Sequence, residues 1–209
     1  MAVGRHKSNK GWMHEHVNDH WVQEAQRLGY RSRAAFKLLE IDGKDHLFKP
    51  GMSVVDLGAT PGSWSQVAVQ KVGTRGRVIA LDLLEMAPLP GVCFIQGDFR
   101  EDAIAKALED ALAGRRVDLV LSDLAPNISG VASADQARSV HLVELAAAFA
   151  AQWLAPDGRF LAKAFQGEGF EALVKELRQQ FKTLHIRKPK ASRDRSPEVY
   201  LLAAGPRGS

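Results

Sequence analysis

Short apolar runs rich in valine, isoleucine and leucine alternate with helical patterns from residue 51 onward. This alternation is typical of βαβ units, in which parallel strands form one sheet and the connecting helices cover its faces. The runs predict strands at 52–57, 77–82, 92–96, 117–122, 159–164, 183–187 and 199–203. The intervening patterns predict helices at 63–72, 101–112, 135–154 and 168–181. We expect a doubly wound, mostly parallel α/β sheet of seven strands, whose last two strands form an antiparallel pair near one edge.

The first 50 residues contain only helical patterns, at 19–28 and 32–41, with Ser32 as a predicted N-cap. The turn Lys49-Pro50-Gly51 leads into the first strand. We interpret residues 1–50 as a basic helical extension and residues 51–209 as a Rossmann-like domain. A chain of 209 residues that is 45% hydrophobic and 25% charged has the size for one domain, so both parts are expected to share it.

The predicted helix at 135–154 has large apolar side chains at spacings of three and four residues. They are Leu142, Leu145, Phe149 and Trp153. One such stripe on a helix normally packs into the core. We therefore expect this stripe to be core and not to contact a cofactor.

No apolar run reaches the roughly 18 uncharged residues that a membrane-spanning helix needs. The basic N-terminus is not followed by an apolar segment of the kind found in secretory signals, so we expect a cytoplasmic protein. Cys93, the single cysteine, lies in an apolar run and is predicted to be buried. A lone cysteine excludes a disulfide framework and a cysteine-based metal site.

The net charge is only +4, but positive charge is clustered near both ends of the chain. Between residues 175 and 195 there are eight basic residues and two acidic ones. Clustered lysines and arginines bind phosphates with a gain from counterion release, although a solvated basic face has the same composition. The predicted RNA contacts are Arg31, Arg33, Arg187, Lys188, Lys190, Arg193 and Arg195.

Residues 54–64 form a buried strand, a glycine-bearing turn and the start of a helix, which is where doubly wound sheets bind cofactors. Gly58 and Gly62 are expected to let the backbone approach a ligand closely. The loop lacks the third glycine of the dinucleotide fingerprint, and Pro61 removes a backbone N–H that a pyrophosphate would use. We therefore expect a cofactor without phosphates, S-adenosylmethionine, while an NAD-type dehydrogenase stays an alternative.

Three acidic residues follow successive predicted strands and support this interpretation. Asp82 is placed to accept hydrogen bonds from ribose hydroxyls, and Asp98 to accept one from an adenine amino group. Asp123 follows the fourth strand. Each acid alone could be a helix cap, but their shared position favours a nucleoside site. Trp64 fits either a cofactor contact or a core aromatic in the first helical turn, and the residues leave both open.

Five sequence blocks in this order resemble the FtsJ (RrmJ, RlmE) family of 23S rRNA uridine-2′-O-methyltransferases. The blocks are SRAAFKL (32–38), DLGATPGSWSQ (56–66), SDLAPN (122–127), KAFQG (163–167) and RDRSPEVY (193–200). The likeness extends over about residues 12–204, with Thr60 and Ser63 where the family usually has alanine and glycine. It implies an S-adenosylmethionine methyltransferase fold and methylation of a uridine ribose in the A-loop of 23S rRNA, within the 50S subunit.

The resemblance also implies a catalytic tetrad of Lys37, Asp123, Lys163 and Glu198, and cofactor contacts at the glycines, Trp64 and the acids named above. From the residues alone, Lys37 fits a solvated helix face. Lys163 ends an apolar strand, where an unpaired ammonium is costly to desolvate, so a paired or functional role is favoured. Glu198 could be only a partner for a nearby arginine.

Methyl transfer to an alcohol is limited by the nucleophile, because a 2′-hydroxyl is weak until its proton is removed. An ordinary lysine, with a pKa of about 10.4, is protonated at neutral pH, so a lysine base needs a special environment. We hypothesise that Lys163 takes the proton and Asp123 orients Lys163 and the methyl donor. Lys37 and Glu198 would position the ribose. No metal is required, and a monomer is expected.

Two other functions stay open at this point. A non-catalytic RNA-binding or ribosome-assembly protein could use the same scaffold, although it would not need all four tetrad residues. A 2′-O-methyltransferase could also act on tRNA or on an mRNA cap. The sequence does not name the nucleotide.

Overall fold

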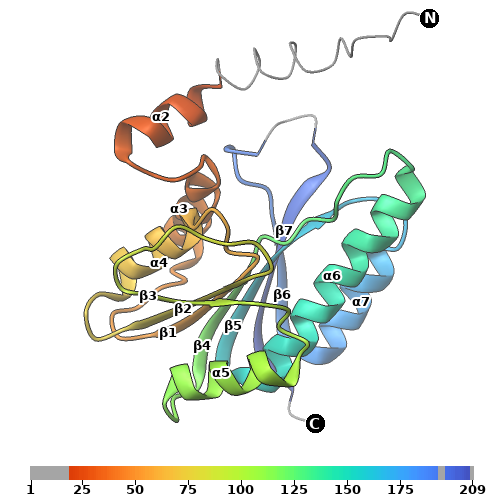
Figure 1. The fold of residues 1–209 in the computed structure, drawn as a ribbon. Helices are drawn as coiled ribbons and strands as arrows, with labels where there is room; N and C mark the ends of the chain where they lie inside the picture. Colours follow the sequence, from red (N-terminus) through yellow and green to blue (C-terminus); the bar gives the residue numbers. More distant parts are fainter. Residues whose placement is uncertain (1–18, 193–195, 208–209) are drawn as a thin grey trace, which may run out of the picture.

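A computed structural model describes residues 19–192 and 196–207, so Arg193 and Arg195 lie outside the described residues. The strands are β1 (Ser53–Leu57), β2 (Arg77–Asp82), β3 (Val92–Gln96), β4 (Val117–Ser122), β5 (Leu154–Phe165), β6 (Phe181–Arg187) and β7 (Glu198–Pro206). They form one seven-stranded sheet in the order β3-β2-β1-β4-β5-β7-β6 (Figure 1). Neighbours from β3 to β5 are parallel, whereas β7 is antiparallel to both β5 and β6. The predicted doubly wound fold and its antiparallel edge pair are confirmed.

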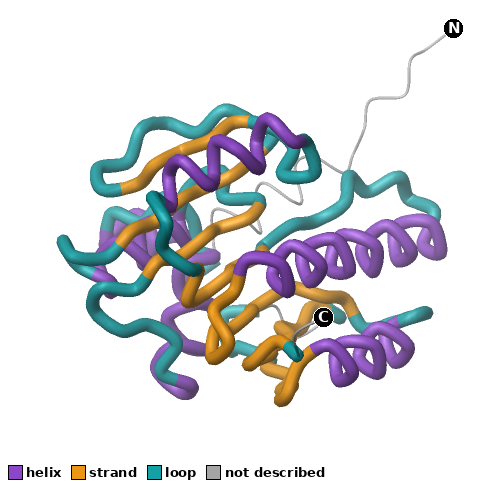
Figure 2. Tube along the Cα trace, turned by 90° about the horizontal axis from the view of Figure 1, so that it is seen from below, coloured by secondary structure: helices purple, strands orange, loops and turns teal. Residues whose placement is uncertain are grey.

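The helices are α2 (His20–Leu28), α3 (Ala34–Asp45), α4 (Ser63–Val72), α5 (Asp102–Leu112), α6 (Ala132–Trp153) and α7 (Phe170–Gln180). They cover both faces of the sheet (Figures 1 and 2). Successive strand residues point to opposite faces, so neighbours in β1 enter different cores. Val54 packs in the core that includes α3 and α4, whereas Val55 packs in the core with α5, α6 and α7.

α3 shares the first of these cores. Its residues Ala35, Leu38 and Ile41 are buried together with Trp64 and Val67 of α4. Burial of apolar surface therefore ties the predicted extension to the sheet. Helix assignment places the N-cap of α3 at Arg33. The predicted cap Ser32 precedes it, and its Oγ accepts a hydrogen bond of 3.2 Å from the Ala34 amide.

The prediction that Cys93 is buried is wrong, because this side chain is exposed. β3 is the edge strand of the sheet, with a neighbour on one side only. α5 packs against Ile95 on the same face of β3, but Cys93, two residues earlier, stays uncovered. An apolar run alone does not distinguish an edge strand from a central one.

The predicted core stripe of α6 is only partly core. Phe149 is buried, but Leu142 and Leu145 are half-buried and line a cavity described below. The core contacts of α6 come mainly from smaller residues: Val143, Ala146, Ala147 and Ala150. Small side chains let the helix lie close to the sheet, which turns the larger leucines toward the cavity. None of the helices in the described part of the chain is long and apolar enough to cross a membrane.

Candidate active site

The predicted catalytic residues meet at the carboxyl ends of the central parallel strands. Asp123 follows β4, and Lys163 lies on the neighbouring parallel strand β5. The antiparallel register of β5 and β7 pairs Lys163 with Tyr200, which places Glu198, the first residue of β7, at the end of β5. α3 brings Lys37 to the same place. Four elements from distant parts of the sequence thus build one cluster.

Two lysine–carboxylate pairs form the centre of this cluster. Lys163 Nζ lies 3.1 Å from Asp123 Oδ1 and donates a hydrogen bond of 2.8 Å to the Asp123 carbonyl oxygen. Lys37 Nζ lies 2.7 Å from Glu198 Oε1. The four side chains are only 9–22% exposed. Because each ammonium faces a carboxylate, the charges compensate one another where water has little access.

Glu198 is fixed by three side chains. Lys37 donates to Oε2 at 2.9 Å, and Oε1 accepts from Ser192 Oγ at 2.8 Å and lies 3.3 Å from Tyr200 Oη. Burial raises the pKa of Glu198, but the charge of Lys37 and the hydrogen bonds from Lys37 and Ser192 outweigh it and lower that pKa overall. The surroundings of Glu198 therefore favour its ionised form, which faces the Lys37 side chain.

Tyr200 is a site residue that sequence reasoning does not single out. It is fully buried, and its hydroxyl lies 3.2 Å from Asp123 Oδ1 as well as near Glu198. Burial, followed by the charges of Asp123 and Glu198, raises the pKa of Tyr200 well above its ordinary value. The hydroxyl stays protonated and donates to one carboxylate at a time. Its place two residues after Glu198, on the same face of the strand, is the only sequence signal for this role.

A cavity of about 470 Å³ adjoins the cluster and contains four of the predicted cofactor contacts. They are Gly58, Asp82, Asp98 and Asp123. Leu124 and the α6 residues Leu142 and Leu145 add apolar surface. A smaller cavity of about 30 Å³ shares Gly58 and Asp123 and is also lined by Trp64 and Asp56. Cavity and tetrad therefore meet at Asp123.

Asp82 and Asp98, two of the three strand-end acids of the cavity, are already hydrogen-bonded. Asp82 accepts from the amides of Thr60 and Leu84, each at 2.8 Å. Asp98 is paired with Arg100, whose hydrogen bonds outweigh burial and hold the pKa of Asp98 below its usual range. Both acids thus line the cavity as the sequence predicts, and Asp82 also orders the loops beside it.

The two glycines of the loop are required by protein contacts. Gly58 has φ +71°, and a Cβ there would lie 2.6 Å from Leu124 Cδ2. Gly62 has φ +104°, and a Cβ there would lie 2.8 Å from Arg31 Nη1 and 2.9 Å from Met86 Sδ. Gly62 does not line the larger cavity. Close approach of two side chains is thus one reason for a glycine at this position, and its predicted contact with a ligand stays a prediction.

The side chain of Trp64 is buried and links neighbouring elements of this region. Its side chain is 2% exposed, and Nε1 donates a hydrogen bond of 2.8 Å to the Ala34 carbonyl oxygen. Its ring lies 5.7 Å from the ring of Tyr200. The indole therefore connects α4, α3 and β7, and it borders only the smaller cavity.

Asp56 at the end of β1 is a second residue that sequence reasoning does not assign a role. It is fully buried, and Oδ2 accepts a hydrogen bond of 2.7 Å from Ser65 Oγ. Oδ1 has no hydrogen-bond partner among the described residues. Burial, together with the charges of Asp123 and Asp82, raises the pKa of Asp56 to about 7, despite the Ser65 hydrogen bonds.

Two of the predicted RNA contacts are occupied by ion pairs inside the protein. Arg33 pairs with Asp19 and donates to the Ala191 carbonyl oxygen. Arg187 forms a two-point pair with Asp45, at 2.6 and 2.7 Å. These arginines connect α2, α3 and the end of β6 to one another. Both arginines therefore stabilise contacts within the protein, and neither guanidinium is in an exposed position where a phosphate would bind.

Lys188 and Lys190 differ from each other. Lys188 Nζ donates to the carbonyl oxygens of Ser196 and Glu198, the latter at 2.7 Å, so it supports the start of β7. Lys190 uses its backbone amide to reach Glu40 and is exposed. Of the predicted RNA contacts that the structure describes, Lys190 is the one that best fits a phosphate contact.

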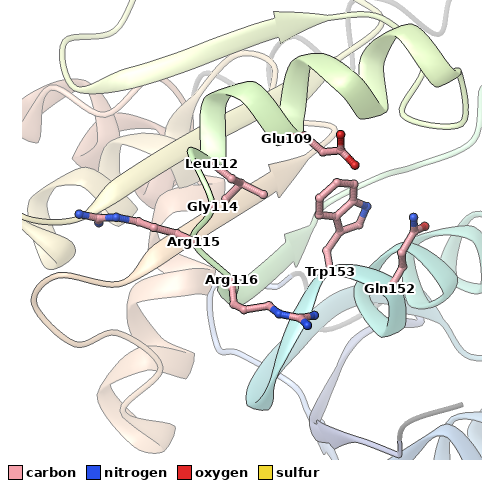
Figure 3. Close-up of a pocket in the computed structure, with 7 residues that line it drawn as sticks. All are labelled: Glu109, Leu112, Gly114, Arg115, Arg116, Gln152 and Trp153. Atoms are coloured by element: carbon pink, nitrogen blue, oxygen red, sulfur yellow. The ribbon is translucent and has the colours of Figure 1, made fainter.

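A third cavity, of about 360 Å³, lies away from the tetrad, beside the C-terminal ends of α5 and α6. Figure 3 shows Trp153 between Glu109 and Gln152 there, with Arg116 nearby. None of the predicted site residues lines it. Within the described residues, no group of three or more histidine, cysteine, aspartate or glutamate side chains could hold a metal ion.

Comparison with known proteins agrees with this geometry. The model of the FtsJ-like methyltransferase family matches residues 30–206. Ribosomal RNA large subunit methyltransferase E of Methylobacillus flagellatus is 62% identical over 198 residues, covering 95% of this chain and 96% of the relative. The protein of the same name from Chromohalobacter salexigens is 59% identical over 207 residues, covering 98% and 99%.

Solved structures give the same result. A Plasmodium falciparum protein described as a ribosomal RNA methyltransferase has a TM-score of 0.78 and 31% identity, covering 86% of this chain and 100% of its own. Fibrillarin from Aeropyrum pernix, at 19% identity and a TM-score of 0.54, shares the fold over 83% of this chain and 75% of its own. The resemblance seen in the five sequence blocks is confirmed, and the chain belongs to the FtsJ-like methyltransferase family.

Proposed function

We propose that this chain transfers the methyl group of S-adenosylmethionine to the 2′-hydroxyl of a uridine ribose in the A-loop of 23S rRNA, within the large ribosomal subunit. The observation that carries the proposal is the position of Asp123, which lines the 470 Å³ cavity and also holds Lys163. A methyl donor in the cavity would thus lie next to a candidate base. The names of the relatives support ribosomal RNA as the substrate.

The charges of the cavity suit S-adenosylmethionine better than a dinucleotide. Asp82, Asp98 and Asp123 line it, and the arginine among its lining residues, Arg100, is already paired with Asp98. Asp123 is paired with Lys163, whereas Asp82 accepts from two backbone amides and keeps its negative charge facing the cavity. This charge repels a pyrophosphate and attracts a sulfonium cation. Asp82 would hold the ribose hydroxyls and Asp98 the adenine amino group. When bound, S-adenosylmethionine supplies the methyl group that is transferred.

In this proposal the residues of the chain prepare the hydroxyl nucleophile. Lys163 first releases its own proton to solvent and, as the neutral amine, accepts the hydroxyl proton, while Asp123 holds Lys163 in place through its carboxylate and its carbonyl oxygen. Glu198 fixes Lys37, and together they position the ribose. Tyr200 lies within hydrogen-bond distance of both carboxylates and orients the one to which its hydroxyl donates. Exact positioning of this kind can contribute several kcal/mol to catalysis.

Mapping ribose methylation on ribosomal RNA by mass spectrometry tests the proposal. A deletion strain should lose one uridine 2′-O-methyl group from the A-loop, and the wild-type gene should restore it. Purified protein with S-adenosylmethionine should restore the group on subunits from that strain. A methyl group missing from tRNA instead, with rRNA unchanged, would contradict the substrate.

Asp82→Ala tests the cofactor assignment. Loss of the ribose acceptor should cost about 1–3 kcal/mol of S-adenosylmethionine binding, because the ribose donors lose their partner. Calorimetry measures the affinity, and RNA affinity should be retained. Asp157→Ala, at an exposed position, is the matched control. Equal cofactor affinity in Asp82→Ala and wild type would exclude this ribose contact.

A further inference from the structure

Arg31 lies in the turn between α2 and α3, and its guanidinium is bound by backbone carbonyl oxygens. Nη1 donates to Pro61 at 2.9 Å and to Ala87 at 2.7 Å. Nη2 donates to Pro88 at 2.7 Å. Hydrogen bonds from a charged donor are stronger than neutral ones, so these three contacts are substantial.

The three carbonyls belong to the two segments that surround Asp82. Pro61 follows Thr60, whose amide donates to one Asp82 oxygen, and Thr60 Oγ1 lies 3.3 Å from the Leu84 carbonyl oxygen. Ala87 and Pro88 follow Leu84, whose amide donates to the other Asp82 oxygen. Arg31 therefore links both segments at a point outside the Asp82 carboxylate.

The packing around the guanidinium is close. A Cβ on Gly62 would lie 2.8 Å from Arg31 Nη1 and 3.3 Å from its Cδ. On the same side, Met86 is only 4% exposed and packs with Ala59 and Ala80. The arginine is thus held against the loop by side-chain packing as well as by hydrogen bonds.

The backbone on both sides of Arg31 is attached to α4. The Arg31 amide donates to Gln66 Oε1 at 2.8 Å, and Ser32 Oγ donates to Ser63 Oγ at 2.8 Å. Gln66 Nε2 donates in turn to the Gly29 carbonyl oxygen at 3.0 Å. The turn between α2 and α3 therefore has a fixed place on the first turns of α4, and it presents the guanidinium to the loops.

We propose that Arg31 is a positioning residue for the cofactor, which clamps the Thr60–Pro61 and Leu84–Pro88 segments so that Asp82 is preorganised. This inference rests on the proposed function, because it concerns the same cofactor site. It replaces the expectation that Arg31 contacts RNA, since its donors are directed at carbonyl oxygens. A clamp of this kind raises affinity by reducing the ordering that binding requires.

The test compares Arg31→Gln and Arg31→Lys with wild type. Both should weaken S-adenosylmethionine binding by about tenfold in calorimetry, the effect of lost preorganisation. Lysine should not restore affinity, because one ammonium cannot bridge three carbonyls in the way that a planar guanidinium does. KM for the cofactor should rise, while kcat at saturating cofactor stays within about twofold. This result is expected because the variants lose the same binding free energy in the ground state and in the transition state.

The matched control is Arg27→Gln, which removes the same charge from an exposed arginine paired with Glu24 on α2. It should leave cofactor affinity unchanged. Binding of ribosomal RNA should keep its salt dependence in the Arg31 variants. If the slope of log RNA affinity against log salt concentration fell by about one counterion in Arg31→Gln, Arg31 would contact a phosphate and the proposal would be overturned. Full affinity in Arg31→Lys would overturn it as well.

Amide hydrogen exchange separates this inference from the proposed function. Without any ligand, the amides of Thr60 and Leu84 should exchange faster in Arg31→Gln than in wild type, because their acceptor Asp82 is less well held. Unchanged exchange would exclude the clamp. If wild type bound no S-adenosylmethionine, the cofactor assignment would fail, and the exchange rates would still decide whether Arg31 holds these segments.

Discussion

Lys163→Arg should lower the single-turnover rate of methyl transfer by about two to four orders of magnitude, the usual loss when a general base is removed. Arginine preserves the positive charge and the hydrogen-bond donors, so its pairing with Asp123 can persist. A guanidinium cannot lose its proton at any working pH. The variant therefore separates proton transfer from charge stabilisation. Cofactor and RNA affinities should stay close to those of wild type.

The pH dependence provides a second measurement for Lys163. The wild-type rate should rise with pH along a one-proton slope, and this slope should be absent from the residual activity of the arginine variant. Lys71→Arg, in the ion pair with Asp42 on α3, is the matched control and should retain full activity. Retention of more than about a tenth of the wild-type rate in Lys163→Arg would exclude a base, given the size of effect expected.

Asp56→Asn should make the free energy of unfolding, measured without ligands, markedly less dependent on pH. The folded-state pKa of Asp56 is raised from 3.8 to about 7, so the folded protein keeps a proton that the unfolded chain has already lost. The stabilisation that results from this raised pKa is complete below about pH 4 and is lost as the pH rises through 7. At 1.36 kcal/mol per pH unit, the loss approaches about 4 kcal/mol at pH 8.

Denaturant unfolding at pH 4, 6 and 8 measures this effect. The free energy of unfolding of the asparagine variant, relative to wild type, should increase steadily across that range. Carboxyls with lowered pKa, such as Glu198 and Asp98, give slopes of the opposite sign, but they are common to both proteins and cancel in the difference. A pH-independent difference would show that folding does not raise the pKa of Asp56.

Periodicity and turn chemistry were sufficient to predict most of the fold. The predicted bounds of β2, β3 and β4 coincide with the observed ones, because each of these parallel strands is a short apolar run between turns. β5 begins at Leu154, five residues before the prediction, since its first part contains Pro156, Asp157 and Gly158, which read as a turn. β4 pairs with Leu154 and then again from Arg159, and the register shifts between the two, so the turn-like residues form an irregularity inside the strand.

The candidate site was less accessible to such reasoning. The strand-end acids could be placed because parallel strands end at one edge, whereas the tetrad depended on the resemblance. Tyr200 and Asp56 were missed because burial of a polar side chain depends on partners distant in sequence. For the same reason Arg31, Arg33 and Arg187 were read as surface charges. Composition records a charge, but it does not show which carbonyl or carboxylate already binds it.

The position of β7 between β5 and β6 has a consequence for the order in which the parts of the site form during folding. β7 is the last strand to be made, yet it separates two strands made before it and carries Glu198 and Tyr200. Until it is inserted, β5 has an open edge and β6 has no neighbour in the sheet. The residues that line the 470 Å³ cavity all precede β7 in the chain, so a folding chain can form this cavity before Glu198 and Tyr200 reach the cluster. In such an intermediate the open edge of β5 is free to pair wrongly, which makes the insertion of β7 the step that is most sensitive to aggregation.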